Sequence, residues 1–346
     1  MAGQWPTLLD ISSRLDPEGK IPVIAEMLSQ SNDYADDLPW VEANEATGHE
    51  FVFRTSIPAG AWRQYNMGVP YSKSTTAKAR VGLGMLEDYS QVDRALAEHS
   101  GDREKFRESE DVAFLEGMSQ TIAQTFFYGN SVTNPAQFMG LSTFYNTLST
   151  SSAANAANVM SGGGSGSSNA SLWLIGWGPE TIFGLYPRGS KAGLDMEDKG
   201  DIVPGFDSFG NRFEAYTSWF RQQAGLCPKD WRYGVRLANL DTTTAGLAGP
   251  NAYDLFAGMG QMLMMFPKLS GHTSGVVKTD APMDDKGVRP VFYTNRTVRH
   301  WMDVQSIRNR NVLLGINDYA GNPVMGFRGI PVKIVDQLTD TEATVS

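Results

Sequence analysis

Cysteine and long apolar runs are scarce in this chain of 346 residues, and each scarcity excludes a class of protein. A single cysteine, Cys227, excludes an internal disulfide and fits a reducing compartment. No window approaches the ~20 apolar residues of a membrane span. The N-terminus lacks a basic stretch followed by an apolar run, which argues against a signal peptide. We therefore expect no membrane partner.

Basic residues are also in deficit, with 29 Lys and Arg against 38 Asp and Glu. The net charge of −9 disfavours the whole chain as a nucleic-acid binder, because neutralising phosphates needs a basic footprint. A locally basic face is still compatible with this sum. The composition is otherwise that of a globular protein, and the length suggests two or three cores.

Metal-binding patterns are missing as well. The histidines stand apart from one another, without the spacing of a zinc site. An acidic cluster near residue 200 lacks the regular spacing of a calcium loop, so a solvated loop is the better interpretation. The histidines are His49, His99, His272 and His300, and the acidic cluster is Asp195, Glu197, Asp198 and Asp201. We expect no metal and no cofactor.

Motifs of catalysis do not occur either. The stretch GGGSGS at 162–167 lacks the Lys-Ser/Thr of a phosphate-binding loop, and G-x-S-x-G is missing. Cys227 is expected to be a buried structural thiol rather than a nucleophile. The sequence therefore gives no positive evidence for an enzyme, and we expect none.

What is present is first a long hairpin. Residues 50–57 predict one strand, and the alternation of apolar and polar or small residues over 77–85 predicts the other. The loop between them, about 17 residues, is far longer than usual hairpin loops. It carries four bulky side chains, Trp62, Tyr65, Met67 and Tyr71. Because a two-stranded hairpin is marginal alone, it predicts a partner surface.

A second unusual element is the helix predicted over residues 103–128. Leu115, Met118, Ile122 and Phe126 recur at helical spacing, and acidic residues crowd the first turns. Such a helix spans roughly 39 Å, which suits a structural strut.

The rest of the chain reads as short elements. We expect short helices within 6–31, a structure-poor segment at 149–171 and a β-rich region at 172–247. Helices are predicted at 250–267 and 296–309, the latter with Val298, Trp301, Met302 and Ile307 as its apolar set. Strands are predicted at 290–295 and around Ile330, Val332 and Ile334.

The order of these elements resembles the major capsid proteins of tailed bacteriophages, which have the Hong Kong 97-like α+β fold. The resemblance spans about residues 7–336. It is carried by LLDISSRLDPEGKI, TGHEFVFRTSIPAGAWRQYNMGVPYSKSTTA, SEDVAFLEGMSQTIAQTFFYGN, SLWLIGWGPETIFGLYPRGSKAGL and LCPKDWRYGVRLANL.

The resemblance implies a division of the chain. Residues 1–48 would be an N-terminal arm, and 49–92 an extended loop lying across a neighbouring subunit. Residues 93–141 would be a peripheral domain with the spine helix 103–128. Residues 142–315 would be an axial domain, and 316–346 a terminal strand returning toward the peripheral domain.

It also implies a function. The chain would self-assemble through hexameric and pentameric capsomers into an icosahedral head shell enclosing phage DNA. Trp62, Tyr65, Met67 and Tyr71 would then be wedged onto the next subunit, since interfaces favour aromatic and Met side chains. The alternative is that this loop folds back onto its own chain as core.

Partners follow from the same resemblance: a portal, a separate scaffold protein, a decoration protein and double-stranded DNA bound without sequence specificity. The protein would be located in the virion, after assembly in the cytoplasm of the host bacterium. Arg188 and Lys191 in YPRGSKAG would face DNA or an axial pore, or form a solvated turn. The rival functions are an encapsulin-like compartment with protein cargo and, less favoured, a soluble enzyme.

Overall fold

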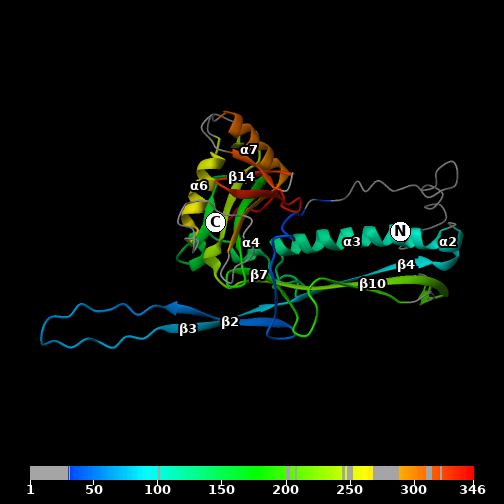
Figure 1. Ribbon diagram of the computed structural model, residues 1–346, viewed down its shortest axis with the longest axis horizontal. Helices are drawn as coiled ribbons and strands as arrows, with labels where there is room; N and C mark the ends of the chain where they lie inside the picture. The colour runs from blue at the N-terminus through cyan, green and yellow to red at the C-terminus, as the bar shows by residue number, and fades with distance from the viewer. Residues whose placement is uncertain are drawn as a thin grey trace.

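The computed structural model describes residues 30, 32–99, 102–199, 203–206, 209–243, 246–247, 252–267, 288–308, 314–319 and 322–346. Figure 1 shows a two-stranded hairpin at one end of the long axis and a long helix beside long strands at the other. Between them rises a compact sheet with covering helices. Of the helices expected within 6–31, only Gln30 is described, so that prediction lies outside the described residues.

The long helix α3 spans Arg103–Tyr128, the range that the sequence predicts. Asp102 caps it, accepting from the Lys105 amide at 3.2 Å. Met118, Ile122 and Phe126 are buried as expected, whereas Leu115 is only partly buried. The helix ends at Gly129, where a Cβ would collide with the Phe138 carbonyl, so only glycine fits this close approach.

Beside α3 lies an antiparallel platform built on the 17-residue strand β10, Arg212–Pro228. Strand β4, Gly84–Asp93, pairs with it from Gly84↔Ala224 to Asp93↔Ala215. Strand β8 (Leu194–Asp198) pairs with residues 218–222 on the other edge of β10, and β9 (Val203–Phe206) pairs with residues 212–215. The short helix α2 (Arg94–His99) joins β4 to α3. The platform therefore gives the helix a surface along its length.

Contacts between helix and platform are partly polar. Asp111, an acidic residue of α3, is buried and accepts a hydrogen bond from Ser218 Oγ at 2.9 Å. The Tyr216 ring lies under the guanidinium groups of Arg103 and Arg107, whose carbons are 5.3 and 5.1 Å from its centroid. This face of β10 therefore holds α3 by charged and aromatic contacts together.

The central sheet confirms the β-rich region expected at 172–247. The order of hydrogen-bonded strands in this sheet is β13-β14-β15-β12-β6-β7-β10-β4, and β11 pairs antiparallel with β6. The remaining bounds are β1 Trp40–Glu42, β5 Val159–Ser161, β6 Asn169–Trp177, β7 Ile182–Tyr186, β11 Gly234–Asp241, β12 Arg289–Thr294, β13 Leu314–Tyr319, β14 Asn322–Phe327 and β15 Ile330–Ile334.

Strand β6 is buried along its whole length because both faces of the sheet are covered. Leu172 and Leu174 belong to one core, and Trp173, Ile175 and Trp177 to the other. This separation follows from the two-residue repeat of a strand, whose side chains alternate between faces. Two large cores on one sheet agree with the number that the chain length suggests.

Helices α6 (Leu255–Met265) and α7 (Arg296–Arg308) cover the leucine face. Helix α6 begins later than predicted, because the Asp254 side chain accepts from the amides of Phe256 and Ala257, both at 3.0 Å. In α7, Val298 and Met302 are buried, but Ile307 is 81% exposed, so its place in the apolar set is wrong.

The tryptophan face packs on the end of α3 and the short helix α4, Leu141–Phe144. Phe126 lies 5.8 Å from Trp177, ring centre to ring centre, and the Trp177 indole donates to Tyr293 Oη at 2.8 Å. Aromatic packing therefore joins α3 to the sheet.

The segment 149–171, expected to be poor in structure, is more ordered than that. It contains the 3-10 turn η1, Ala154–Asn158, and β5, which pairs parallel with β11. Asn158 explains this order, because its amide donates to the carbonyls of Arg232 and Gly234, both at 2.9 Å. A second 3-10 turn, η2 (Trp231–Tyr233), precedes β11.

The end of the chain closes the sheet. Strands β14 and β15 are joined by a tight turn in which Arg328 and Gly329 have positive φ. Strand β15 pairs parallel with β12, so the terminal strand lies within the central sheet. After it, Thr339 and Glu342 bond to Tyr128 at the end of α3. No helix among the described residues is long and apolar enough to cross a membrane.

Candidate functional site

The hairpin formed by β2 (Gly48–Ser56) and β3 (Thr75–Gly82) projects away from the rest of the molecule (Figure 1). Its strands pair from Gly48↔Gly82 to Ser56↔Thr75. The first predicted strand is confirmed, and the second is confirmed over 77–82, because β3 ends at Gly82 and Gly84 begins β4. Strand β4 pairs with β10 in the platform, so residues 84–92 belong to the platform rather than to this hairpin.

The base of the hairpin is held firmly. The Asn44 side chain bridges both backbone groups of Glu50, donating to its carbonyl at 2.7 Å and accepting from its amide at 2.9 Å. Val81 packs in a small core with Phe183 and Cys227. This half of the hairpin is thus fixed to β7 and β10.

His49 belongs to the same base. Its ring meets the Phe183 ring edge to face at a centroid distance of 6.0 Å. Burial, and then the nearby charge of Lys229, lower the pKa of His49. The imidazole is therefore held toward its neutral form, which suits an aromatic contact.

The stalk of the hairpin has two unlike faces, because cross-strand partners share a face. One face carries Phe51 and Phe53 opposite Ala79 and Ala77. The other carries basic side chains, Arg54, Lys78 and Arg80. Phe53 is 41% exposed, so the apolar face is not covered by its own chain.

The tip, between Ser56 and Thr75, is wholly solvent-exposed. Relative exposures are 105% for Trp62, 94% for Tyr65, 60% for Met67 and 106% for Tyr71. The alternative that this loop folds back as core is therefore wrong for the single chain. Soluble proteins seldom leave such apolar groups together in water without a binding role.

Arg188 and Lys191 are exposed in the connection between β7 and β8. The Gly189 amide between them donates to Glu42 Oε1 at 2.8 Å, which fixes the turn. They belong to a different connection from the tip residues, so the structure does not unite the two predicted sets in one element.

The other sequence candidates have structural explanations. Asp195 pairs with Arg221 at 2.9 Å and Asp198 with Arg107 at 2.8 Å, whereas Asp201 is not described. Over the described ranges, no group of three or more His, Cys, Asp and Glu is arranged to hold a metal ion. Cys227 is buried, as predicted, and burial raises the pKa of its thiol to about 12.

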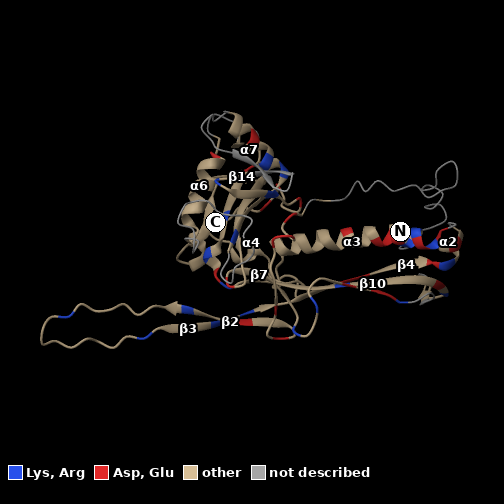
Figure 2. Cartoon of the chain, in the orientation of Figure 1, with Lys and Arg blue, Asp and Glu red and all other residues tan. Residues whose placement is uncertain are grey.

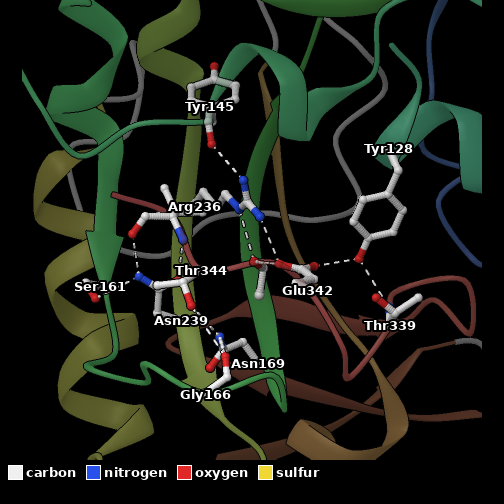
Figure 3. Close-up of polar contacts among 12 residues, drawn as sticks. Tyr128, Tyr145, Ser161, Gly166, Asn169, Arg236, Asn239, Thr339, Glu342 and Thr344 are labelled. Atoms are coloured by element: carbon white, nitrogen blue, oxygen red, sulfur yellow. Dashed lines mark hydrogen bonds and ion pairs between the residues drawn. The ribbon is translucent and has the colours of Figure 1, made fainter. Parts of the chain in front are cut away.

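Sequence reasoning missed a buried polar cluster under the central sheet (Figure 3). Arg236 and Glu342 form an ion pair at 2.8 Å with side chains only 5% and 4% exposed. Tyr128 Oη donates to the other Glu342 oxygen at 2.5 Å, and Arg236 donates to the Tyr145 carbonyl at 2.7 Å. The signal in the sequence was an arginine between two apolar residues, Val235 and Leu237, of a strand.

The cluster attaches the C-terminal segment to the rest of the chain. Asn239 donates to the Val345 carbonyl and accepts from its amide, both at 2.8 Å. Burial and the adjacent Glu342 carboxylate raise the pKa of Tyr128, so this phenol stays protonated and donates. Arg236 and Glu342, at the centre of the cluster, bond to protein partners, which supports a structural role for this pair.

Comparison with known proteins gives consistent matches. The family model described as major capsid protein GP7 matches residues 16–346. A solved structure of bacteriophage Epsilon15 is similar at 33% identity with a TM-score of 0.73, covering 100% of this chain and 98% of that chain. None of the curated proteins matches.

Two further solved structures are more remote. A capsid of bacteriophage JBD30 is 11% identical with a TM-score of 0.48, covering 91% of this chain and 93% of that one. The SrpI encapsulin of Synechococcus elongatus PCC 7942 is 11% identical with a TM-score of 0.41, covering 68% and 97%.

Proposed function

The chain belongs to the major capsid protein GP7 family, and on this premise we propose that the β2–β3 hairpin is the element by which one subunit of the shell holds the next. The protein is a structural component of the icosahedral head of a phage virion. The fold is that of phage capsid proteins, the Hong Kong 97-like fold expected from the sequence.

One observation carries the proposal: the four bulky side chains at the tip are exposed although the base of the same hairpin is fixed. Anchoring at the base limits the positions that the tip can take, which lowers the ordering cost of binding. Aromatic and Met side chains are the residue types enriched at interface centres. A sister subunit is the partner that a closed shell of identical chains supplies.

The energy available is substantial. Full burial of an apolar side chain contributes ~1.5–3 kcal/mol, so three of the four tip residues contribute several kcal/mol per subunit before ordering costs. In a shell every subunit repeats this contact. A modest contact per subunit therefore stabilises the whole particle.

The remaining parts take roles in the same proposal. Residues 1–48 serve as an arm, 49–92 as the extended loop with its root in β4, 93–141 as the peripheral domain around α3, and 142–315 as the axial domain. Residues 316–346 close the central sheet and return to α3 through Glu342 and Tyr128, whose contact at 2.5 Å supports this path.

The contents of the shell are double-stranded DNA, bound without sequence specificity. The net charge of −9 supports this, because a shell that bound its cargo tightly everywhere would hinder packing and release. Arg188 and Lys191, both exposed, are proposed to face the DNA or an axial pore. A portal, a scaffold protein and a decoration protein complete the partners. Nuclease-protected DNA in purified particles separates this function from an encapsulin-like compartment.

The test of the hairpin is the double variant Trp62→Ala/Tyr65→Ala. We expect particles tens of nanometres wide to be lost in negative-stain images, while circular dichroism of the subunit is unchanged. The matched control is Met264→Ala/Ile307→Ala, which removes side chains that are 76% and 81% exposed on α6 and α7. Normal assembly of the hairpin variant would remove this role for the tip.

A further inference from the structure

His49 lies near the base of the hairpin that projects from the rest of the molecule in Figure 1. The ladder between β2 and β3 begins at the pair Gly48↔Gly82, and His49 belongs to the next pair, opposite Val81. A Cβ on Gly48 would lie 2.7 Å from the Val81 carbonyl oxygen, so the two strands approach each other closely here. A change in the state of His49 therefore acts at the joint of the hairpin.

The imidazole joins separate segments of the chain. Its Nδ1 accepts a hydrogen bond from the Asn44 amide at 3.3 Å, in the connection between β1 and β2. Its ring packs edge to face on Phe183 of β7, which is buried, and lies 6.5 Å from the Phe51 ring, centroid to centroid. Because Nδ1 accepts, the neutral ring carries its proton on Nε2. The neutral form therefore fastens the hairpin to both neighbours.

On the elements that pack against it, the imidazole meets apolar groups and one cation. Val81 of β3 is its cross-strand partner, and Phe183 of β7 meets its ring. Among the described residues, Lys229, directly after the end of β10, is the charged group that acts on its titration. Burial, and then Lys229, lower the pKa of His49, so both oppose a positive charge on the ring.

Carboxylates that could offset such a charge are engaged elsewhere or face away. Figure 2 shows acidic as well as basic residues where the hairpin meets the rest of the chain. Glu45 pairs with Arg80 at 3.0 Å. Glu180 pairs with Lys229. Glu50 is the next residue of β2, so its side chain lies on the opposite face of the strand. An imidazolium here would therefore lack a carboxylate partner within the described part of the chain.

From this geometry we propose that His49 is an acid-sensitive latch: the neutral imidazole holds the base of the hairpin, and its protonation releases that base. The imidazolium carries a proton on Nδ1, so the Asn44 amide loses its acceptor and two N–H groups oppose each other. The new charge also lies near Lys229. The inference rests on the proposed hairpin contact and adds that acid weakens this contact by freeing the hairpin.

Neutral pH should keep the base closed, and acid should open it. Because the folded protein lowers the pKa of His49, the latch contributes fully above about pH 6.5, where histidine ordinarily titrates. Its contribution is lost as pH falls through the lowered pKa. Carboxyl groups ordinarily titrate near about pH 4. An opening between about pH 7.5 and 5.5 therefore belongs to histidine rather than to Asp or Glu.

The first experiment measures hydrogen exchange of the amides at residues 44–50 and 81–83 in the unassembled full chain, corrected for the intrinsic effect of pH. Protection should fall between about pH 7.5 and 5.5 by up to about tenfold, the limit for one proton over one pH unit. It should stay level in His49→Phe, which keeps an aromatic ring but cannot titrate. The control His99→Phe replaces an exposed histidine of α2 and should keep the fall. Equal profiles for His49→Phe and the unaltered protein would overturn the latch.

A second variant tests the charge near the imidazole. Lys229→Gln removes the cation that lowers the pKa of His49, so the midpoint of the fall should move to higher pH. The matched control Lys199→Gln removes a lysine that likewise pairs with a carboxylate, Glu197 at 2.7 Å, and should leave the midpoint in place. A midpoint that does not respond to Lys229→Gln, or that moves equally in both variants, would contradict the latch.

Assembly of the same proteins, followed by light scattering, connects the latch to the hairpin contact. The unaltered protein should assemble more slowly at about pH 5.5 than at about pH 7.5, whereas His49→Phe should assemble equally fast at both. If Trp62→Ala/Tyr65→Ala stops assembly but His49→Phe keeps the slowing in acid, the hairpin contact stands and the latch is wrong. If that double variant assembles normally while the base still opens through His49, the latch stands and the hairpin contact is wrong.

Discussion

Replacing Glu342 by glutamine tests the buried cluster of Figure 3 at its centre. The change keeps the shape of the side chain but removes the negative charge opposite Arg236, whose side chain is 5% exposed. Removing one partner of a buried pair leaves an uncompensated charge, and such changes destabilise by about 3–5 kcal/mol. Ser171, which donates to the same carboxylate, loses its ionised acceptor as well.

The assay is urea unfolding of the unassembled subunit, followed by tryptophan fluorescence, since Trp173 lies against the Arg236 guanidinium at 5.1 Å from its ring centre. The control is Glu98→Gln in the exposed pair with Arg94, where we expect a change below about 1 kcal/mol. The double variant Arg236→Met/Glu342→Leu should recover much of the loss, because no buried charge remains. A loss for Glu342→Gln no larger than that for Glu98→Gln would refute the reasoning.

Two further predictions concern the core. Cys227 should react with a thiol reagent at pH 8 only after urea is added. Burial raises the pKa of the thiol in the folded protein to about 12. The contribution of this thiol to the free energy of unfolding is therefore complete below the ordinary thiol pKa and is lost as pH rises toward 12. Rapid labelling of the folded subunit would contradict this. Phe126→Ala should destabilise the subunit by about 3–5 kcal/mol, whereas Val112→Ala on the exposed side of α3 should change stability by less than about 0.5 kcal/mol, both measured by urea unfolding. Equal effects would mean that the buried face of α3 is assigned wrongly.

The sequence predicts elements well where one physical signal dominates. Helix α3 has apolar residues at helical spacing and acidic residues in its first turns, and its predicted ends agree with the structure. The hairpin strands follow a two-residue repeat, and their pairing follows from it. The exposure of the tip could be inferred because its loop is too long and too apolar for an ordinary turn.

Other features depend on contacts between distant residues, which periodicity does not encode. Nothing near Glu342 indicates that it meets an arginine 106 positions earlier. Strand β5 was missed because its order comes from the side chain of Asn158 and from pairing with β11. Ile307 was placed in the core by its chemistry, but it lies at the end of α7, beyond the packed surface.

The continuity of β3 with β4 has a mechanical consequence. Only Leu83 separates the two strands, so a pull on the hairpin tip passes directly into the ladder between β4 and β10. Ladder bonds in an antiparallel pair stand perpendicular to the strands, so tension along the molecule loads them together in shear instead of opening them one at a time. When the packaged contents press on the shell from inside, each subunit should resist stretching along the direction of its contact with the neighbouring subunit.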